Sequence, residues 1–274
     1  MKVTVHSPWP VAPERRRIAG HMVMLLGGLF ALWWFMRLGR VLGDVWVVAV
    51  WAGVALVMAR GLFRRARIRR RAWRHAYLDP ESPWNRWLRG GPLLFFSQLV
   101  KAGALSAVLL ASVVRVGGEP VFWRLMLVAV LLFVWGRMKT EQVVWWDVAP
   151  GYRPELVARL GQCWTAAVLV PCLVAWALVQ PQPDFRDASL EQALWHAADQ
   201  EVAVSAVVER AAQWLALWHG LEQWAAQQVS ALELSHWVRG GVWLSVLVRQ
   251  SLFVMSLLVV FNGVLAGSLH DGQR

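Results

Sequence analysis

Negative charge is nearly missing from the longest apolar segments of this 274-residue sequence, where only Asp44 occurs, at the edge of one segment, and charge of either sign is scarce. Charged residues make up 16% of the chain and hydrophobic residues 58%, whereas a soluble domain has about 25% and about 45–50%. The apolar residues gather in blocks of about 17–23, and about 20 such residues cross the hydrocarbon core of a bilayer. A soluble fold of amphipathic helices or alternating strands is therefore excluded, and the sequence predicts an all-α, polytopic membrane bundle.

Cysteine and catalytic motifs are also scarce. The two cysteines, Cys163 and Cys172, lie in one apolar block at a spacing that matches neither a redox pair nor a zinc site. No G-x-S-x-G, H-E-x-x-H or Walker sequence occurs. Only His21 falls at membrane depth, which excludes a pair of axial histidines for a haem. We therefore expect no catalytic residue, no cofactor and no enzyme activity.

Six apolar blocks predict six membrane-spanning helices, and an even number places both ends of the chain on one side. The first block is too long for the core of a signal peptide, which has about 7–15 residues, so we expect it to be retained. Pro171 lies within the fifth block, where it could kink the helix. The expected spans are 18–36, 41–59, 92–114, 121–136, 160–179 and a sixth within 241–267.

The distribution of Lys and Arg among the loops predicts the orientation. With the N-terminus in the cytoplasm, cytoplasmic segments hold 19 of the 28 basic residues and the opposite side holds seven. Because cytoplasmic loops are enriched in Lys and Arg, this bias favours both termini in the cytoplasm. The Arg-, Ala- and Trp-rich composition and the absence of eukaryotic sorting signals favour a bacterial inner membrane.

The spans and loops divide the chain into nine segments. They are a cytoplasmic N-terminus (1–17), a transmembrane hairpin (18–59), a basic cytoplasmic loop (60–91), spans three and four (92–136), a cytoplasmic loop (137–159), span five (160–179), an acidic helical extracytoplasmic domain (180–236), span six (237–269) and a cytoplasmic tail (270–274).

The segment 180–236 carries eight acidic residues against two arginines. Ser189 and Gln192 have the spacing of a capping box, in which each side chain satisfies a free N–H at the start of a helix. No Pro and a single Gly occur between Gln192 and Glu233, so we expect one or two amphipathic helices that dock partner proteins. The predicted apolar face consists of Trp214, Leu217, Trp218, Leu221, Trp224 and Ala225.

Two basic residues are candidates for a functional site at membrane depth. Lys101 lies near the middle of the third span, where a charge costs about 2.5–3.5 kcal/mol on insertion scales. It either forms a substrate or ion site or, as we favour, extends to an interface. Arg249 lies within the sixth span if that span starts near Gly241. It is an interfacial anchor, the interpretation we favour, if the span starts near Gln250, which leaves about 20 residues to cross.

Three pairs of His and acidic residues occur at i, i+3 spacing in the acidic segment. Such pairs share a helix face and can bind a metal together with a facing helix, but charged pairs on a solvated helix have the same spacing. We favour solvated pairs. The minor candidates for metal ligands are His196 with Asp199, His219 with Glu222, and Glu233 with His236.

A run of arginines follows the second span. We favour contact with anionic lipid, worth about 1 kcal/mol per basic residue, over an acidic protein partner. Nucleic acid is not expected, because only Trp73 and Tyr77 offer stacking nearby. The expected lipid contacts are Arg64, Arg65, Arg67, Arg69, Arg70 and Arg71.

Two classes of function remain open. The first is a non-enzymatic accessory or scaffold subunit of a membrane complex, favoured because the spans are poor in charge and the varied sequence lies outside them. The second is a small transporter or channel with Lys101 in its pathway and Arg249 as a second candidate. Small residues four apart, such as Gly103, Ala107 and Ala111, permit close helix packing within the chain or in a homodimer.

Overall fold

The computed structural model describes residues 12–77, 91–144, 148–149, 151–180, 183–231 and 236–268, and within these ranges the elements are α-helices. The helices are α1 (Ala12–Gly39), α2 (Asp44–Tyr77), α4 (Pro92–Val116), α5 (Pro120–Val144), α6 (Arg153–Val179), α7 (Leu190–Asp199), α8 (Ala206–Ala231) and α9 (His236–Ser268). Six of them, namely all but α7 and α8, are long and apolar enough to cross a membrane. This confirms the prediction of an all-α chain with six candidate spans.

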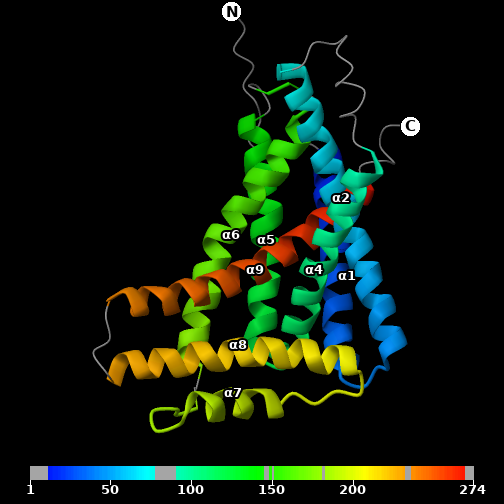
Figure 1. The fold of residues 1–274 in the computed structure, drawn as a ribbon. Helices are drawn as coiled ribbons and strands as arrows, with labels where there is room; N and C mark the ends of the chain where they lie inside the picture. The colour runs from blue at the N-terminus through cyan, green and yellow to red at the C-terminus, as the bar shows by residue number, and fades with distance from the viewer. Residues whose placement is uncertain are drawn as a thin grey trace, which may run out of the picture.

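Five of the candidate spans stand side by side and the sixth crosses them (Figure 1). Helices α1, α2, α4, α5 and α6 run along roughly one direction, whereas α9 runs obliquely across the bundle. Helix α8 lies across one end, with α7 on its outer side (Figure 1). We call this end, where α1 turns into α2 and α4 into α5, the hairpin end. The opposite end, where α1 begins and α9 ends, is the terminal end.

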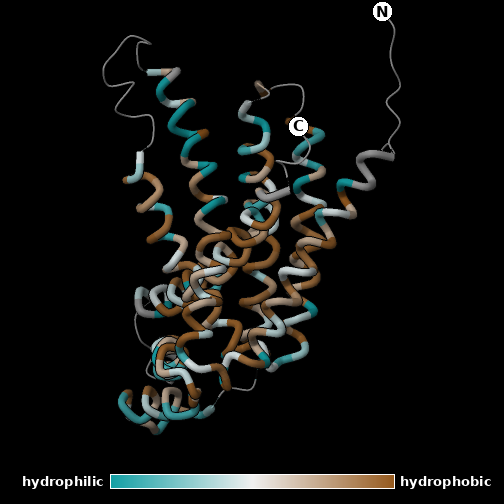
Figure 2. The backbone as a smooth tube through the Cα atoms, turned by 90° about the vertical axis from the view of Figure 1, so that its right-hand side faces the viewer, coloured by the Kyte–Doolittle hydropathy of each residue, from teal (hydrophilic) through white to brown (hydrophobic). Residues whose placement is uncertain are grey.

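The core of the bundle is apolar and receives side chains from all six spans. Fully buried members are Leu25 (α1), Met58 (α2), Leu109 (α4), Phe133 (α5), Leu169 (α6) and Phe261 (α9). Many outward-facing positions of the same helices are also apolar, as expected for helices surrounded by lipid. Figure 2 shows the hydrophobic residues concentrated along the middle of the spans and hydrophilic residues towards their upper ends.

Helix α2 continues well past residue 59, where we expected the second span and its helix to end. The arginine run therefore lies on a helix and not in a loop. Arg and Ala have high helix propensity, and no Gly or Pro occurs between Gly61 and Tyr77. Hydropathy locates where a span leaves the lipid, but the helix itself continues until a residue breaks it. For the same reason α5 runs to Val144, past its expected end at 136.

Other helix boundaries follow local signals in the sequence. Helix α6 begins before residue 160 because Pro154 occupies its first turn, where proline is favoured. Pro171 lies within α6 without ending it. The segment 183–231 contains two helices, as expected, and the predicted capping box is confirmed. Ser189 Oγ accepts a hydrogen bond from the Gln192 amide at 3.2 Å, and Gln192 Oε1 accepts one from the Ser189 amide at 2.9 Å.

Helix α9 approaches α2 closely because two glycines face each other where these helices cross. A methyl group on Gly263 would overlap the carbonyl oxygen of Val57, and one on Gly61 would lie 3.1 Å from Gly263 Cα. Small residues allow helix backbones to come together in this way within a membrane. Gly103 also packs within the chain, since its carbonyl oxygen accepts a 3.0 Å hydrogen bond from the Trp51 indole.

Replacing Gly263 with alanine should therefore destabilise the fold. The added methyl group forces α9 away from α2, and overpacking of this kind costs about 1–3 kcal/mol. We expect Gly263→Ala to lower the midpoint of thermal unfolding in detergent, followed by circular dichroism. The matched control is Gly53→Ala in α2, where a methyl group meets nothing within 4 Å, so the midpoint should not fall. Equal stability of the two variants would rule out the close crossing.

Candidate functional site

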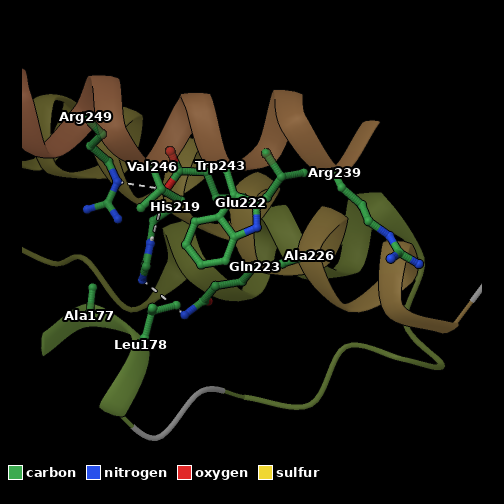
Figure 3. Close-up of a pocket in the computed structure, with 11 residues that line it drawn as sticks. Ala177, Leu178, His219, Glu222, Gln223, Ala226, Arg239, Trp243, Val246 and Arg249 are labelled. Carbon is green, nitrogen blue, oxygen red and sulfur yellow. Dashed lines mark hydrogen bonds and ion pairs between the residues drawn. The ribbon is translucent and has the colours of Figure 1, made fainter. Parts of the chain in front are cut away.

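Two neighbouring cavities lie at the hairpin end, between α6, α8 and α9. The larger has a volume of about 430 Å³ and the smaller a volume of about 260 Å³. Ala177, His219 and Arg249 line both cavities and so stand at their common boundary. The larger cavity is also lined by Glu222, Gln223, Arg239 and Trp243 (Figure 3). The smaller cavity reaches α4 and α5, with Arg115, Glu119 and Phe122 in its wall.

The polar side chains of the site come from two helices that pack against each other. Trp218 and Glu222 lie one turn apart on α8, and Ser245 and Arg249 lie one turn apart on α9, so each pair shares a helix face. The Trp218 indole donates a hydrogen bond to Ser245 Oγ at 2.8 Å, and Ser245 Oγ donates to Glu222 Oε1 at 2.8 Å. Arg249 Nε donates to Glu222 Oε2, also at 2.8 Å. These bonds join α8 to α9.

The Glu222–Arg249 ion pair is the centre of this arrangement (Figure 3). The Glu222 side chain is 4% exposed and the Arg249 side chain 18% exposed. A buried charge is very unfavourable unless it is paired and hydrogen-bonded, and Ser245 supplies the second hydrogen bond to the carboxylate. Each residue therefore requires the other in place.

A second ion-pair cluster joins the ends of the spans to the segment between α7 and α8. Arg115 Nε, at the end of α4, lies 3.3 Å from Glu201 Oε1, and Arg40 Nη2 lies 3.4 Å from Glu201 Oε2. Arg115 Nη1 also donates to the Leu215 carbonyl oxygen in α8 at 2.7 Å. Beside this cluster, Ser205 Oγ donates to Asp44 Oδ1, at the start of α2, at 2.5 Å. The helices that do not span the bundle are thus held to it by charged and polar contacts.

His219 is the titratable group at the boundary of the cavities. Burial lowers its pKa below the ordinary value, and the positive charges of Arg249 and Arg115 lower it further, against the opposing effect of Glu222. Its Nδ1 is 3.9 Å from Glu222 Oε2, too far for a hydrogen bond, and has no hydrogen-bond partner among the described residues. Its Nε2 lies 3.1 Å from Gln223 Nε2. The imidazole is therefore neutral at pH 7, and its Nδ1 is a buried atom without a hydrogen-bond partner among the described residues.

Burial raises the pKa of Glu222, but His219, Arg249 and Ser245 outweigh this effect and leave the pKa below its ordinary value. The carboxylate is therefore charged at neutral pH. Each cavity has two arginines and one glutamate in its wall, namely Arg239, Arg249 and Glu222 in the larger cavity and Arg115, Arg249 and Glu119 in the smaller one, which gives each an excess of one positive charge. Such a site suits a small polar or anionic ligand.

The two intramembrane candidates from the sequence lie in different surroundings. Arg249 is part of the continuous helix α9 and is paired with Glu222, so it is neither an isolated charge in a span nor a free surface anchor. Lys101 lies on the exposed surface of α4 and lines neither cavity. Its side chain therefore points away from the core of the bundle, a position from which a lysine can extend to an interface.

The six candidate metal ligands do not come together where the structure describes them. His219 and Glu222 are neighbours on α8, but Glu222 is bonded to Arg249 and Ser245. His196 lies on α7, beside Gln200, and Asp199 is exposed. Glu233 and the side chain of His236 lie outside the described residues. Among the residues with described side chains, no group of three or more His, Cys, Asp or Glu residues could hold a metal ion.

The buried face of α8 differs from the predicted apolar face. Val208, Ala212, Ala216 and Gly220 face the neighbouring helices, and a methyl group on Gly220 would lie only 3.1 Å from the Ala193 carbonyl oxygen of α7. Small side chains allow this close packing, whereas Trp218 and Trp224 are half-buried and donate hydrogen bonds to Ser245 Oγ and to the Ala188 carbonyl oxygen. Of the predicted face, Trp214 is 74% exposed and Leu221 is 44% exposed.

No family model matches the chain, and no curated protein and no solved structure shows significant similarity to it. The function proposed below therefore depends on the geometry of the described residues.

Separating the Glu222–Arg249 pair should destabilise the protein strongly. Glu222→Gln leaves Arg249 without its partner, and Arg249→Met leaves a buried carboxylate, so we expect each to lower the free energy of unfolding by about 3 kcal/mol or more. The double variant should lose less than the sum of the two, by at least about 1 kcal/mol. Denaturant titration in detergent measures all three.

The control for this cycle is the exposed pair between Arg17 and Glu141, whose atoms are 3.1 Å apart. Glu141→Gln should cost less than about 1 kcal/mol, as is usual for surface ion pairs. If Glu222→Gln cost no more than Glu141→Gln, the pair would not hold α8 to α9.

The lowered pKa of His219 predicts a pH dependence of stability. As the pH is lowered from 7.5 to 5.5, the His219 imidazole binds a proton in the unfolded chain but not in the folded site. The free energy of unfolding should therefore decrease as the pH is lowered over this range. The effect of Glu222 appears only at lower pH, because its ordinary pKa is 4.5. His219→Gln should flatten the stability curve in this range, whereas His196→Gln, at an exposed position on α7, should not. Parallel curves for wild type and His219→Gln would contradict the assignment.

Proposed function

We propose that the protein is a non-enzymatic scaffold subunit of a membrane complex, which docks a partner protein through helices α7 and α8. The observation that carries the proposal is the exposed apolar stripe of α8, which consists of Val207, Trp214 and Leu221. These residues are seven apart, so they follow one face of the helix. The hydrogen bonds and the ion pair that Trp218 and Glu222 form with α9 fix the position of α8, so the stripe has a fixed orientation relative to the bundle.

The packed interior of the bundle favours a scaffold function over a channel function. Between the charged clusters at the two ends, the core is filled by large apolar side chains from every span. At the terminal end, Arg65 is bonded to Gln162 at 2.6 Å and lies 3.6 Å from Glu155, and Arg137 donates to Asn262 at 3.1 Å. In the described part of the bundle these charges are engaged with neighbouring helices, as in a structural framework.

The proposed location is a bacterial inner membrane, with the terminal end in the cytoplasm. The arginine-rich end of α2 lies at the terminal end, and cytoplasmic loops are enriched in Lys and Arg. Helices α7 and α8 would then lie on the extracytoplasmic side, where they could dock a periplasmic or membrane partner.

The alternative is a small transporter or channel with Lys101, and Arg249 as a second candidate, in its pathway. The two cavities with Arg249 and His219 at their boundary favour it. Lys101 is less well placed for this role, because it lies on the outer surface of α4. The two functions differ in the role of the α8 stripe. A modification that blocks the stripe would release a bound partner from a scaffold, but it would have no such effect on a transporter.

The scaffold proposal predicts that the stripe is covered in native membranes. In a chain with Cys163→Ala and Cys172→Ala, Leu221→Cys should resist an impermeant maleimide added to spheroplasts that contain the partner. The same variant should react after reconstitution into vesicles of phospholipid alone, because the partner is then missing. Mass spectrometry of the labelled protein measures both reactions.

Two controls make each outcome decisive. Val202→Cys, at a 71% exposed position off the stripe, should react in both preparations, and its failure to react in spheroplasts would contradict the orientation. Reaction of Leu221→Cys in both preparations would exclude a partner. Protection in both would assign the stripe to lipid or to a second copy of the chain.

A further inference from the structure

A third cavity lies at the terminal end, beside the part of α2 that extends past the membrane span. Its volume is about 680 Å³. Five arginines of α2 line it, at positions that recur every three or four residues and so form one stripe along the helix: Arg60, Arg64, Arg67, Arg71 and Arg74. The floor and opposite wall include Phe63, Ile68, Tyr152 and Ala266. The cavity therefore combines a row of guanidinium groups with an apolar floor.

Among the residues that the structure describes, none that lines this cavity is acidic. Arg60, Arg64 and Arg71 form no ion pair with any residue that the structure describes, and the Arg67 guanidinium lies over the Phe63 ring at 5.7 Å. Arg65, on the opposite face of α2, is instead bonded to Gln162 and paired with Glu155. The arginine run thus includes Arg65, which joins α2 to α6, and four arginines of the stripe, Arg60, Arg64, Arg67 and Arg71, whose charges face the cavity without a carboxylate among the described residues.

The stripe continues into an exposed apolar strip on the same face of α2. Leu56 and Gly53 precede Arg60 by four and seven residues, so they lie below it on one face. Leu56 is exposed, and a methyl group on Gly53 would meet nothing within 4 Å. Figure 2 shows this end of α2 as a hydrophilic extension above the hydrophobic part of the bundle. A ligand with a charged head and an apolar tail fits both parts.

The length of the stripe indicates more than one phosphate group. Arg60 and Arg74 are fourteen residues apart, which is about 21 Å along a helix. One phosphate reaches the arginines of one turn, whereas two bridged phosphates reach two successive pairs. Arginine binds phosphate through paired, charge-assisted hydrogen bonds, and basic pockets between spans bind lipid headgroups with two or more charges.

We propose that this cavity binds the headgroup of an anionic phospholipid with two phosphates, such as two phosphodiesters bridged by glycerol. Arg60 and Arg64 hold one phosphate and Arg67 and Arg71 the other. The acyl chains lie along α2 past Leu56 and Gly53. The lipid thereby fills the space between α2, the start of α6 and the end of α9.

The test compares two variants that each remove two charges from the same arginine run. Arg64→Gln/Arg67→Gln removes two members of the stripe, and Arg69→Gln/Arg70→Gln removes two exposed arginines that do not line the cavity. Purified protein in a neutral detergent is titrated with diphosphatidylglycerol, phosphatidylglycerol or inorganic pyrophosphate, and binding is measured by native mass spectrometry. General attraction of lipid to a basic helix would weaken equally in both variants.

We expect one molecule of diphosphatidylglycerol to bind the wild type more tightly than phosphatidylglycerol or pyrophosphate. Arg64→Gln/Arg67→Gln should weaken this binding by at least about tenfold, and Arg69→Gln/Arg70→Gln by less than about twofold. Equal weakening in the two variants, or the absence of bound diphosphatidylglycerol, would overturn the site. Equal affinity for pyrophosphate would overturn the lipid as its ligand and assign the site to a soluble phosphate. Equal unfolding midpoints of the unliganded variants exclude misfolding as the cause.

Discussion

The buried ion pair between Glu222 and Arg249 determines how the chain closes its hairpin end. Glu222 belongs to a helix that does not span the bundle, and Arg249 belongs to the oblique helix α9, so their 2.8 Å contact fixes α8 against the bundle. Because neither charge is stable alone in this environment, the position of α8 is coupled to the position of α9. The cavities, the neutral His219 and the outward-facing stripe of α8 all follow from that coupling.

Hydropathy was sufficient to predict the spans but not the lengths of the helices. Five of the six predicted spans lie within one helix each, and the second, predicted from residue 41, begins in the turn 41–43 before α2 starts at Asp44. An apolar block of this length must satisfy its backbone hydrogen bonds internally in lipid. Charged residues end the membrane-embedded part without ending the helix, which is why α2 carries its arginines to Tyr77. Helix α6 starts before the apolar block at 160–179, with Pro154 in its first turn, and hydropathy does not locate this start.

The candidate site was predictable only in part. The sequence points to His219 and Glu222 only as a pair of candidate metal ligands, and to Arg249 only as an isolated charge. It does not join the three residues, because a single sequence does not reveal which helices pack together. The signal that could have joined them is the i, i+4 spacing of Trp218 with Glu222 and of Ser245 with Arg249, two polar faces of matching length. The sequence marks an apolar face of α8 by its large side chains, but it does not show that the contacts with neighbouring helices are made mainly at alanine and glycine positions.

The arginines at the two ends of the bundle differ in whether they contact a carboxylate of the chain. At the hairpin end, Arg40, Arg115 and Arg249 each meet a carboxylate within the chain, so their charges serve to position helices. At the terminal end, the stripe that lines the third cavity meets no carboxylate from the described part of the chain. A guanidinium row at the boundary of an apolar bundle is best satisfied by an anion from outside the chain, and phospholipid is the anion that a membrane always supplies. In the two proposals made above, the hairpin end is closed by contacts within the chain and leaves apolar surface for a protein partner, whereas an anionic lipid completes the terminal end.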